Sequence, residues 1–186
     1  MIYPHFGSIE PLLTPNPLPH DLNLMTRPAM SSKSAGIVAF RTRHGKLEVL
    51  LVHPGGPFWR KKDLGAWSIP KGEYASGEDP EYVARREFRE ELGIELIEDL
   101  LPLGEVRQRG GKTVQAFAVE CDIDMENISS NKFEIEWPPR SGRRQAFPEI
   151  DRAEWFDLGV ACIKINQAQR TLLERLEAIN VNAEKR

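Results

Sequence analysis

The sequence marks both ends of one helix, at Asp79-Pro80 and at Gly93. Aspartate is a favoured N-cap residue, and proline suits the first helical position, where its missing N–H would have no partner anyway. Glycine commonly follows a helix because it adopts the left-handed backbone at no steric cost. We therefore predict a helix from Pro80 to Leu92. Its apolar residues recur every four positions, which predicts one face packed on a core. These residues are Ala84, Phe88 and Leu92.

Most of the remaining chain predicts β-strands, because short apolar and β-branched runs alternate with glycine- or proline-containing turns. The predicted strands are Ser34–Arg41, Leu47–His53, Ala66–Ile69, Leu100–Arg107, Thr113–Cys121, Phe133–Trp137 and Ala153–Phe156. The polar, arginine-bearing segment Pro138–Ala146 is predicted to be a loop. A second helix is predicted over Cys162–Leu176, with Ile163 among the residues of its apolar face. Strands mixed with two separated helices indicate a mixed sheet covered by helices.

The first 32 residues differ from the rest in their proline content. Six of the fourteen prolines fall there, with little hydrophobic periodicity between them. Such a segment cannot bury enough apolar surface to offset the entropy of ordering it. We predict a flexible, proline-rich extension over residues 1–32, one folded domain over 33–180, and a frayed tail over 181–186.

The bulk composition excludes several classes of protein. A net charge of −3 argues against a surface that coats nucleic acid, although a small basic pocket remains compatible with it. Cys121 and Cys162 lack C-x-x-C spacing, which indicates a reducing compartment without a zinc site or disulfide framework. No apolar run reaches the ~18 residues that a membrane span needs, and no signal peptide is visible. We expect a cytoplasmic protein.

Three carboxylates, at Glu87, Glu90 and Glu91, share one side of the predicted helix. Residues three or four apart are neighbours on a helix surface, so these like charges repel one another. A hard divalent cation would turn this repulsion into binding, because Mg²⁺ takes oxygen ligands and is usually held by carboxylates together with substrate phosphates. On the helix alone, a solvated amphipathic surface with ordinary Glu–Arg pairs is the more frequent arrangement.

The residues before the helix favour the metal interpretation. Here the chain resembles the Nudix hydrolases, whose signature is G-x(5)-E-x(7)-R-E-U-x-E-E-x-G-U, where U is a bulky apolar residue. The matching residues are Gly72, Glu78, Arg86, Glu87, Phe88, Glu90, Glu91, Gly93 and Ile94. The one departure is Phe88, because family members usually carry an aliphatic residue there. The resemblance extends more loosely over Lys33 to Leu176.

The resemblance implies an α/β/α sandwich with a mixed β-sheet between helices. It also implies hydrolysis of a nucleoside diphosphate linked to another group, by a water that Mg²⁺, or alternatively Mn²⁺, activates. The implied metal ligands are the carboxylates of Glu87, Glu90 and Glu91 and the carbonyl of Gly72. Glu78 and Arg86 are implied to join the preceding loop to the helix and to orient the ligands.

The run WSIPKG, which ends at Gly72, resembles the W-x-x-P-K-G run of Nudix diadenosine polyphosphate hydrolases. Nucleotide-sanitising relatives often have an uncharged residue where this chain has Lys71. A lysine there would supply a point charge for a long polyphosphate. The alternative is a surface lysine that happens to lie beside an acidic site.

A basic and aromatic loop supplies further candidates for substrate binding. Trp59, Arg60 and Lys62 combine a ring that can stack on a base with charges that can contact phosphate. The alternative is that Trp59 or the adjacent Phe58 belongs to the core and that the charges are solvated. Arg107 is another substrate-binding candidate.

The general base is expected among the acids near the last predicted strand. Many Nudix enzymes complete the metal or base set with an acid just before that strand, so Glu149 is the first candidate here. Glu134 and Glu136 are weaker candidates, and an ordinary loop acid is the alternative for each. This segment resembles bacterial Nudix proteins described only as predicted NTP pyrophosphohydrolases.

Three functional hypotheses follow. The first is a Mg²⁺-dependent pyrophosphohydrolase of nucleoside polyphosphates, with dinucleoside polyphosphates such as diadenosine tetraphosphate favoured. The second is a (d)NTP or RNA 5′-end pyrophosphohydrolase, which would take a triphosphorylated or capped RNA end. The third is a Nudix-like module that binds a nucleotide without cleaving it, although such modules often lack glutamates that are present here. The expected partner is a small nucleotide. Neither a membrane nor a nucleic acid, apart from such an RNA end, is expected as a partner.

Overall fold

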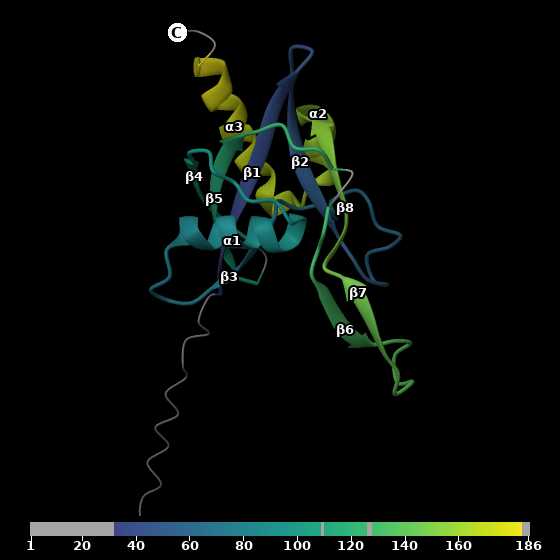
Figure 1. Ribbon diagram of the computed structural model, residues 1–186. Helices are drawn as coiled ribbons and strands as arrows, with labels where there is room; N and C mark the ends of the chain where they lie inside the picture. Colours follow the sequence, from purple (N-terminus) through teal and green to yellow (C-terminus); the bar gives the residue numbers. More distant parts are fainter. Residues whose placement is uncertain (1–31, 109, 126–127, 184–186) are drawn as a thin grey trace, which may run out of the picture. The chain divides into compact units, whose positions relative to one another are not determined.

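The computed structural model describes residues 32–108, 110–125 and 128–183. The predicted proline-rich extension lies, except for Ser32, outside the described residues. In the described part, the chain forms one mixed sheet with helices on both faces and one separate hairpin (Figure 1). The first strand begins at Lys33, where the folded domain was predicted to start.

Five strands follow one another across the main sheet in the order β4-β5-β1-β2-β8. Their bounds are β1 Lys33–Arg43, β2 Lys46–Pro54, β4 Leu101–Arg107, β5 Thr113–Glu120 and β8 Ile150–Asp157. β1 pairs antiparallel with β2 and parallel with β5, so the sheet is mixed. β1 is the middle strand of this order, and seven of its residues in succession, from Ser34 to Phe40, are therefore buried.

A short strand, β3 (Lys71–Tyr74), pairs antiparallel with the first half of β1. The predicted strand at Ala66–Ile69 is wrong, because that segment forms only isolated single-residue bridges. Pro70 lacks a backbone N–H and so cannot donate to a neighbouring strand, but it keeps its carbonyl acceptor. Its carbonyl accepts a 3.0 Å hydrogen bond from the N–H of Ile37, and regular pairing begins just after it. Gly72 therefore lies within a strand and not in a loop.

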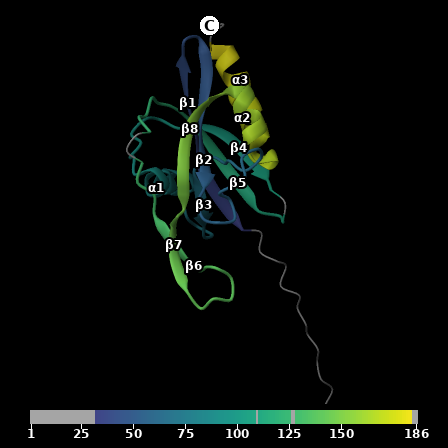
Figure 2. The same ribbon diagram turned by 90° about the vertical axis from the view of Figure 1, so that its right-hand side faces the viewer.

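The two faces of the sheet are covered by different helices, as Figure 2 shows edge-on. α1 (Pro80–Leu92) packs over one face, and α2 (Leu158–Lys164) and α3 (Arg170–Ala183) pack over the other. Alternate residues of β1 point to opposite faces. Ala35, Ile37 and Ala39 join the α1 side, whereas Val38 and Phe40 join the other core. This confirms the predicted α/β/α sandwich. No helix in the described part is long and apolar enough to cross a bilayer.

Helix α1 has the bounds that its end signals predicted. The Asp79 side chain accepts a 3.1 Å hydrogen bond from the N–H of Glu81, and Gly93 adopts φ 75°. The Gly93 N–H donates to the carbonyl of Arg89 over 2.7 Å, which closes the last turn. The buried stripe consists of Val83, Ala84, Phe88 and Leu92. Phe88 is fully buried, so the aromatic ring takes the place of the family's usual aliphatic side chain.

The predicted helix at Cys162–Leu176 is two helices. The observed elements are α2 Leu158–Lys164, the 3₁₀ turn Gln167–Gln169 and α3 Arg170–Ala183. Asn166 causes the break, because its side chain accepts from the N–H of Ala168 and caps a new turn. Ile163 is 58% exposed and does not belong to the buried face, which the helical periodicity had wrongly indicated. α3 continues to Ala183, so residues 181–183 are helical and not a frayed tail.

A two-stranded hairpin, β6 (Lys132–Glu136) and β7 (Arg144–Pro148), extends from the domain (Figure 1). The predicted loop at Pro138–Ala146 is therefore too long, because its last three residues pair with β6. The last strand of the sheet, β8, is longer than its predicted core of Ala153–Phe156. The ladder with β2 continues past a register shift at His53 and Pro54, which the alternation of apolar residues did not reveal.

Candidate active site

Arg86 organises the acidic side of α1. Its guanidinium donates to the Glu87 carboxylate over 2.8 Å and to the Glu78 carboxylate over 3.1 Å. Glu90 lies 3.9 Å from the same group. Arg86 thus contacts several carboxylates at once. Its bond to Glu78 connects the segment before α1 to the helix.

Gly72 makes room for Glu87. A Cβ atom added at Gly72 would overlap the Glu87 carboxylate, so only glycine lets this side chain lie against β3. The sequence suggested that glycine was needed for close approach to a ligand. The structure shows a further reason, which is close approach to a side chain fifteen positions later in the chain.

Glu91 is the most desolvated of the three carboxylates. Its Oε1 accepts a 3.3 Å hydrogen bond from the backbone N–H of Lys71, whereas its buried Oε2 has no hydrogen-bond partner among the described residues. Burial raises the pKa of the Glu91 carboxyl to about 8, against the opposing pull of the Lys71 charge. Glu87 and Glu149 raise it further, which places both within electrostatic reach. A buried carboxylate oxygen without a partner is costly unless a cation or proton satisfies it.

This burial predicts how the stability of the metal-free protein depends on pH. The folded Glu91 carboxyl has a pKa of about 8, whereas its ordinary value is 4.5. Between these values the folded protein keeps a proton that the unfolded chain has released, so the free energy of unfolding falls as the pH rises. In EDTA, Glu91→Gln should therefore raise the free energy of unfolding at about pH 8 by on the order of 2 kcal/mol.

The same substitution should change little near pH 4, where glutamate is protonated in both states. Urea unfolding of both proteins in EDTA, across about pH 4 to 8, measures the difference. A difference that stays constant across this range would contradict a buried, proton-holding carboxyl at Glu91.

Lys71 lies within the acidic cluster, half-buried on β3. Burial lowers the pKa of its ammonium group, and the nearby carboxylates of Glu91, Glu87 and Glu73 oppose that shift. A further cation, Lys112, pairs with Glu73 over 2.8 Å. Sequence reasoning assigned no role to Glu73 or Lys112. The basic turn before β5 was the only sequence signal for Lys112, because its contact with Glu73 joins residues 39 positions apart.

The oxygen-rich donor set suits a hard divalent cation. Within the described residues, no three acidic, imidazole or thiol groups already converge as a complete ligand set, and Glu87 instead faces Arg86. The donors nevertheless fit Mg²⁺ by their chemistry, because a buried carboxylate oxygen of Glu91 has no hydrogen-bond partner among the described residues and the charges of Glu87 and Glu149 act on the same group.

Glu149 lies between β7 and β8, with its side chain exposed. Its carbonyl accepts a 2.8 Å hydrogen bond from the N–H of Gly55, and its own N–H donates to the carbonyl of Asn131. Two backbone contacts therefore hold the residue in place, while its charge acts on Glu91. The other two acids face elsewhere, because Glu134 pairs with Arg144 and Glu136 accepts from Gly142 in the hairpin.

The basic and aromatic candidates lie on residues 55–62, which we call the strap. Trp59 is 38% exposed, and the Lys62 ammonium lies 4.4 Å from the centre of its ring. Phe58 is 61% exposed and meets Trp137 of the hairpin edge-to-face, with ring centres 5.3 Å apart. Neither ring belongs to the core, which removes the alternative considered for them. Arg60 is exposed on the same segment.

Arg107 lies at a different place. Arg107 lines a recess of about 710 Å³ with Gln108, Asn166, Gln167, Ala168 and Gly65. None of the carboxylates of α1 contributes to the wall of this recess. Arg107 therefore lines a surface other than the acidic side of α1, where β4 contacts the 3₁₀ turn.

Comparison with known proteins shows which family the chain resembles over most of its length. The family model described as the NUDIX domain matches residues 30–176. The crystal structure of an Ap4A hydrolase from C. elegans, in a binary complex, is 25% identical with a TM-score of 0.57. That match covers 81% of this chain and 98% of the hydrolase. The comparison with curated protein sequences found no match.

A second solved structure shares the fold. The NUDIX domain of Shewanella oneidensis NrtR, crystallised with ADP ribose, is 16% identical with a TM-score of 0.57. The match covers 83% of this chain and 91% of that domain. At this identity the likeness concerns the fold alone.

Proposed function

Because the chain belongs to the Nudix family of hydrolases, which act on phosphoanhydride bonds, we propose that it is a Mg²⁺-dependent pyrophosphohydrolase of nucleoside polyphosphates. Dinucleoside polyphosphates of the diadenosine tetraphosphate type are the favoured substrates. The observation that carries the proposal is the buried, unpartnered Oε2 of Glu91 within reach of Glu87 and Glu149. A hard cation would satisfy that oxygen, and Mg²⁺ held by carboxylates commonly binds substrate phosphates as well.

The proposed ligands are the carboxylates of Glu87, Glu90 and Glu91 and the carbonyl of Gly72. Mn²⁺ takes the same oxygen donors and is the alternative ion. When bound, the cation supplies positive charge at the phosphoryl oxygens of the substrate. Arg86 holds the Glu87 carboxylate and, with Glu78, connects the segment before α1 to the helix, which supports its role in orienting the proposed ligands.

Glu149 is the proposed proton acceptor for the attacking water. It is exposed, held by two backbone hydrogen bonds, and close enough to affect the charge of Glu91. A general base must lie within hydrogen-bond reach of the water whose proton it takes. Its electrostatic effect on Glu91 and its place outside the Arg86 network support that role for Glu149.

Two features support a long polyphosphate substrate. Lys71 places a cation among the carboxylates, where it can contact a phosphate that extends beyond the cleaved bond. The strap, with Trp59, Arg60 and Lys62, offers a base-stacking ring and two cations. The similarity to an Ap4A hydrolase over 98% of its length supports the same substrate class. A cytoplasmic enzyme agrees with its two free thiols, Cys121 and Cys162.

A nucleotide panel tests the proposal. Diadenosine tetraphosphate, ATP, ADP-ribose and a 5′-triphosphorylated RNA are each incubated with the protein in Mg²⁺ or EDTA, and mass spectrometry identifies the products. We expect diadenosine tetraphosphate to be cleaved fastest, and only in the presence of the cation. Carrying out the reaction in ¹⁸O-water identifies which phosphate receives the water.

The outcomes separate the three hypotheses. Cleavage of ATP or RNA with diadenosine tetraphosphate untouched would support the second hypothesis and remove the favoured substrate. Tight nucleotide binding without any turnover, in Mg²⁺ or Mn²⁺, would instead support a binding module.

A further inference from the structure

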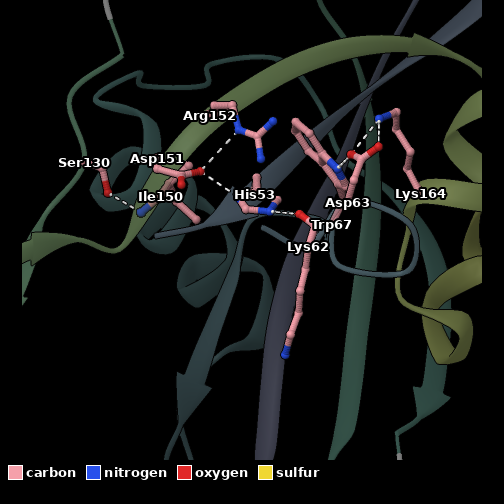
Figure 3. Close-up of polar contacts among 9 residues, drawn as sticks. All are labelled: His53, Lys62, Asp63, Trp67, Ser130, Ile150, Asp151, Arg152 and Lys164. Carbon is pink, nitrogen blue, oxygen red and sulfur yellow. Dashed lines mark hydrogen bonds and ion pairs between the residues drawn. The ribbon is translucent and has the colours of Figure 1, made fainter. Parts of the chain in front are cut away.

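His53 is a buried polar residue outside the acidic cluster. It is fully buried near the end of β2, and its ring packs edge-on against Trp67 with centres 5.1 Å apart. Its Nδ1 lies 2.6 Å from Oδ1 of Asp151, and its Nε2 lies 2.8 Å from the carbonyl oxygen of Lys62. Figure 3 shows the ring between these two partners. Both of its nitrogens are therefore engaged.

The two contacts hold the ring from opposite sides. A carbonyl oxygen can only accept, so Nε2 must carry a hydrogen and donate it to Lys62. On the other side, Nδ1 and the Asp151 carboxylate form a contact of 2.6 Å, and the Arg152 guanidinium lies 3.6 Å from the same carboxylate oxygen. His53 is therefore braced between the segments that carry Lys62 and Asp151.

The two partners belong to the two segments that carry the proposed substrate-binding residues and the proposed base. The Lys62 carbonyl ends the strap, which carries the exposed ring of Trp59. Asp151 lies two residues after Glu149 at the start of β8. The other end of the strap is also held next to the start of β8, because the Gly55 N–H donates to the Glu149 carbonyl over 2.8 Å. His53 thus joins the substrate-contacting strap to the strand that carries the proposed base.

We propose that His53 is a positioning residue with two separable effects, which rests on the function proposed above. Through Nε2 it fixes the strap and hence the affinity for the substrate. Through Nδ1 it fixes the start of β8 and hence the placement of Glu149. It contacts neither the substrate nor the cation, and acts only through these two segments.

Two substitutions separate the effects, because each keeps one donor. The amide nitrogen of asparagine takes the place of Nδ1, and that of glutamine takes the place of Nε2. His53→Asn should retain the bond to Asp151 and lose the one to Lys62, so we expect KM to rise roughly tenfold at nearly constant kcat. His53→Gln should retain the bond to Lys62, so kcat should fall roughly tenfold at nearly constant KM. His44→Gln, in an exposed turn, is the matched control and should change neither.

Hydrogen exchange, measured by mass spectrometry, tests the brace without any substrate. His53→Asn should speed exchange in the strap, and His53→Gln should speed it at residues 149–152. If both histidine variants fail to fold, Asp151→Ala at a partly exposed position still removes the Nδ1 contact and should lower kcat at constant KM.

Equal changes in both variants, in the kinetic constants and in exchange, would overturn the proposal and leave a purely structural histidine. If the wild-type protein cleaves nothing in the nucleotide panel, the proposed function fails. Hydrogen exchange then tests the positioning role of His53 separately. Faster exchange in both segments in each variant would overturn that role, whereas faster exchange in a different segment in each variant would support it.

Discussion

Replacing Glu91 by Gln should reduce kcat for the best nucleotide substrate by about 10³-fold, equivalent to about 4 kcal/mol of transition-state stabilisation. The amide has nearly the same shape as the carboxylate but carries no charge, so it binds a hard cation poorly. The buried Oε2 of Glu91 has no hydrogen-bond partner in the described part of the chain that could take the place of a cation. Steady-state kinetics at saturating Mg²⁺, with calorimetric titration of the ion, would measure both the rate and the affinity.

The stability of this variant separates chemistry from folding. The same substitution should stabilise the metal-free protein at about pH 8, because it removes a carboxyl whose pKa burial raises to about 8. A variant that is more stable and far less active has lost a functional group rather than its fold. Glu95→Gln, at an exposed acid just beyond the helix, is the control and should retain full activity. Activity at the wild-type level in Glu91→Gln would remove the proposed metal site.

Replacing Gly72 by Ala should also inactivate the enzyme, by about 10²-fold in kcat, although it touches no charge. A methyl group at this position would overlap the Glu87 carboxylate, which would have to leave its place beside β3 and Arg86. The methyl would not enter either hydrophobic core, so the melting temperature should change little. Activity assays and thermal unfolding of the same preparation distinguish displacement of Glu87 from loss of the fold.

Gly159→Ala provides the matched control for this steric argument. Gly159 is exposed in the first turn of α2, where an added Cβ would meet only the Asp157 side chain, at 3.3 Å. Alanine favours a helix over glycine, so this variant should be active and at least as stable as the wild type. Full activity of Gly72→Ala would show that Glu87 can adopt another position without cost, and would weaken its assignment as a ligand.

How well each element could be predicted depended on the range of its contacts. Helix α1 matched its predicted bounds because Asp79 and Gly93 cap it through bonds within four residues. The strand at residues 66–69 was wrong because apolar composition does not reveal which segment the neighbouring strand will pair with. The prediction of one long C-terminal helix was wrong because the Asn166 side chain accepts a hydrogen bond from the backbone N–H of Ala168, which competes with the helix.

The candidate site shows the same division. Glu87 was predicted from helical spacing, and Glu78 and Arg86 from the resemblance to the Nudix signature; the structure joins the three in one hydrogen-bonded group. Arg107 was also predicted for the site, but it lines a recess elsewhere, since its location depends on where β4 ends in the sheet. Position along the chain did not indicate that difference.

The sequence by itself determined helix α1, its caps and the acidic residues it carries, because these depend on one helix and its own periodicity. Only the tertiary structure decided that Glu91 is desolvated beside Lys71 and that Gly72 must lack a side chain. It alone joined His53 to Asp151, 98 positions away. The physical reason is that desolvation, steric exclusion and bonds between distant segments arise only when the chain packs, and no local pattern of residues encodes them.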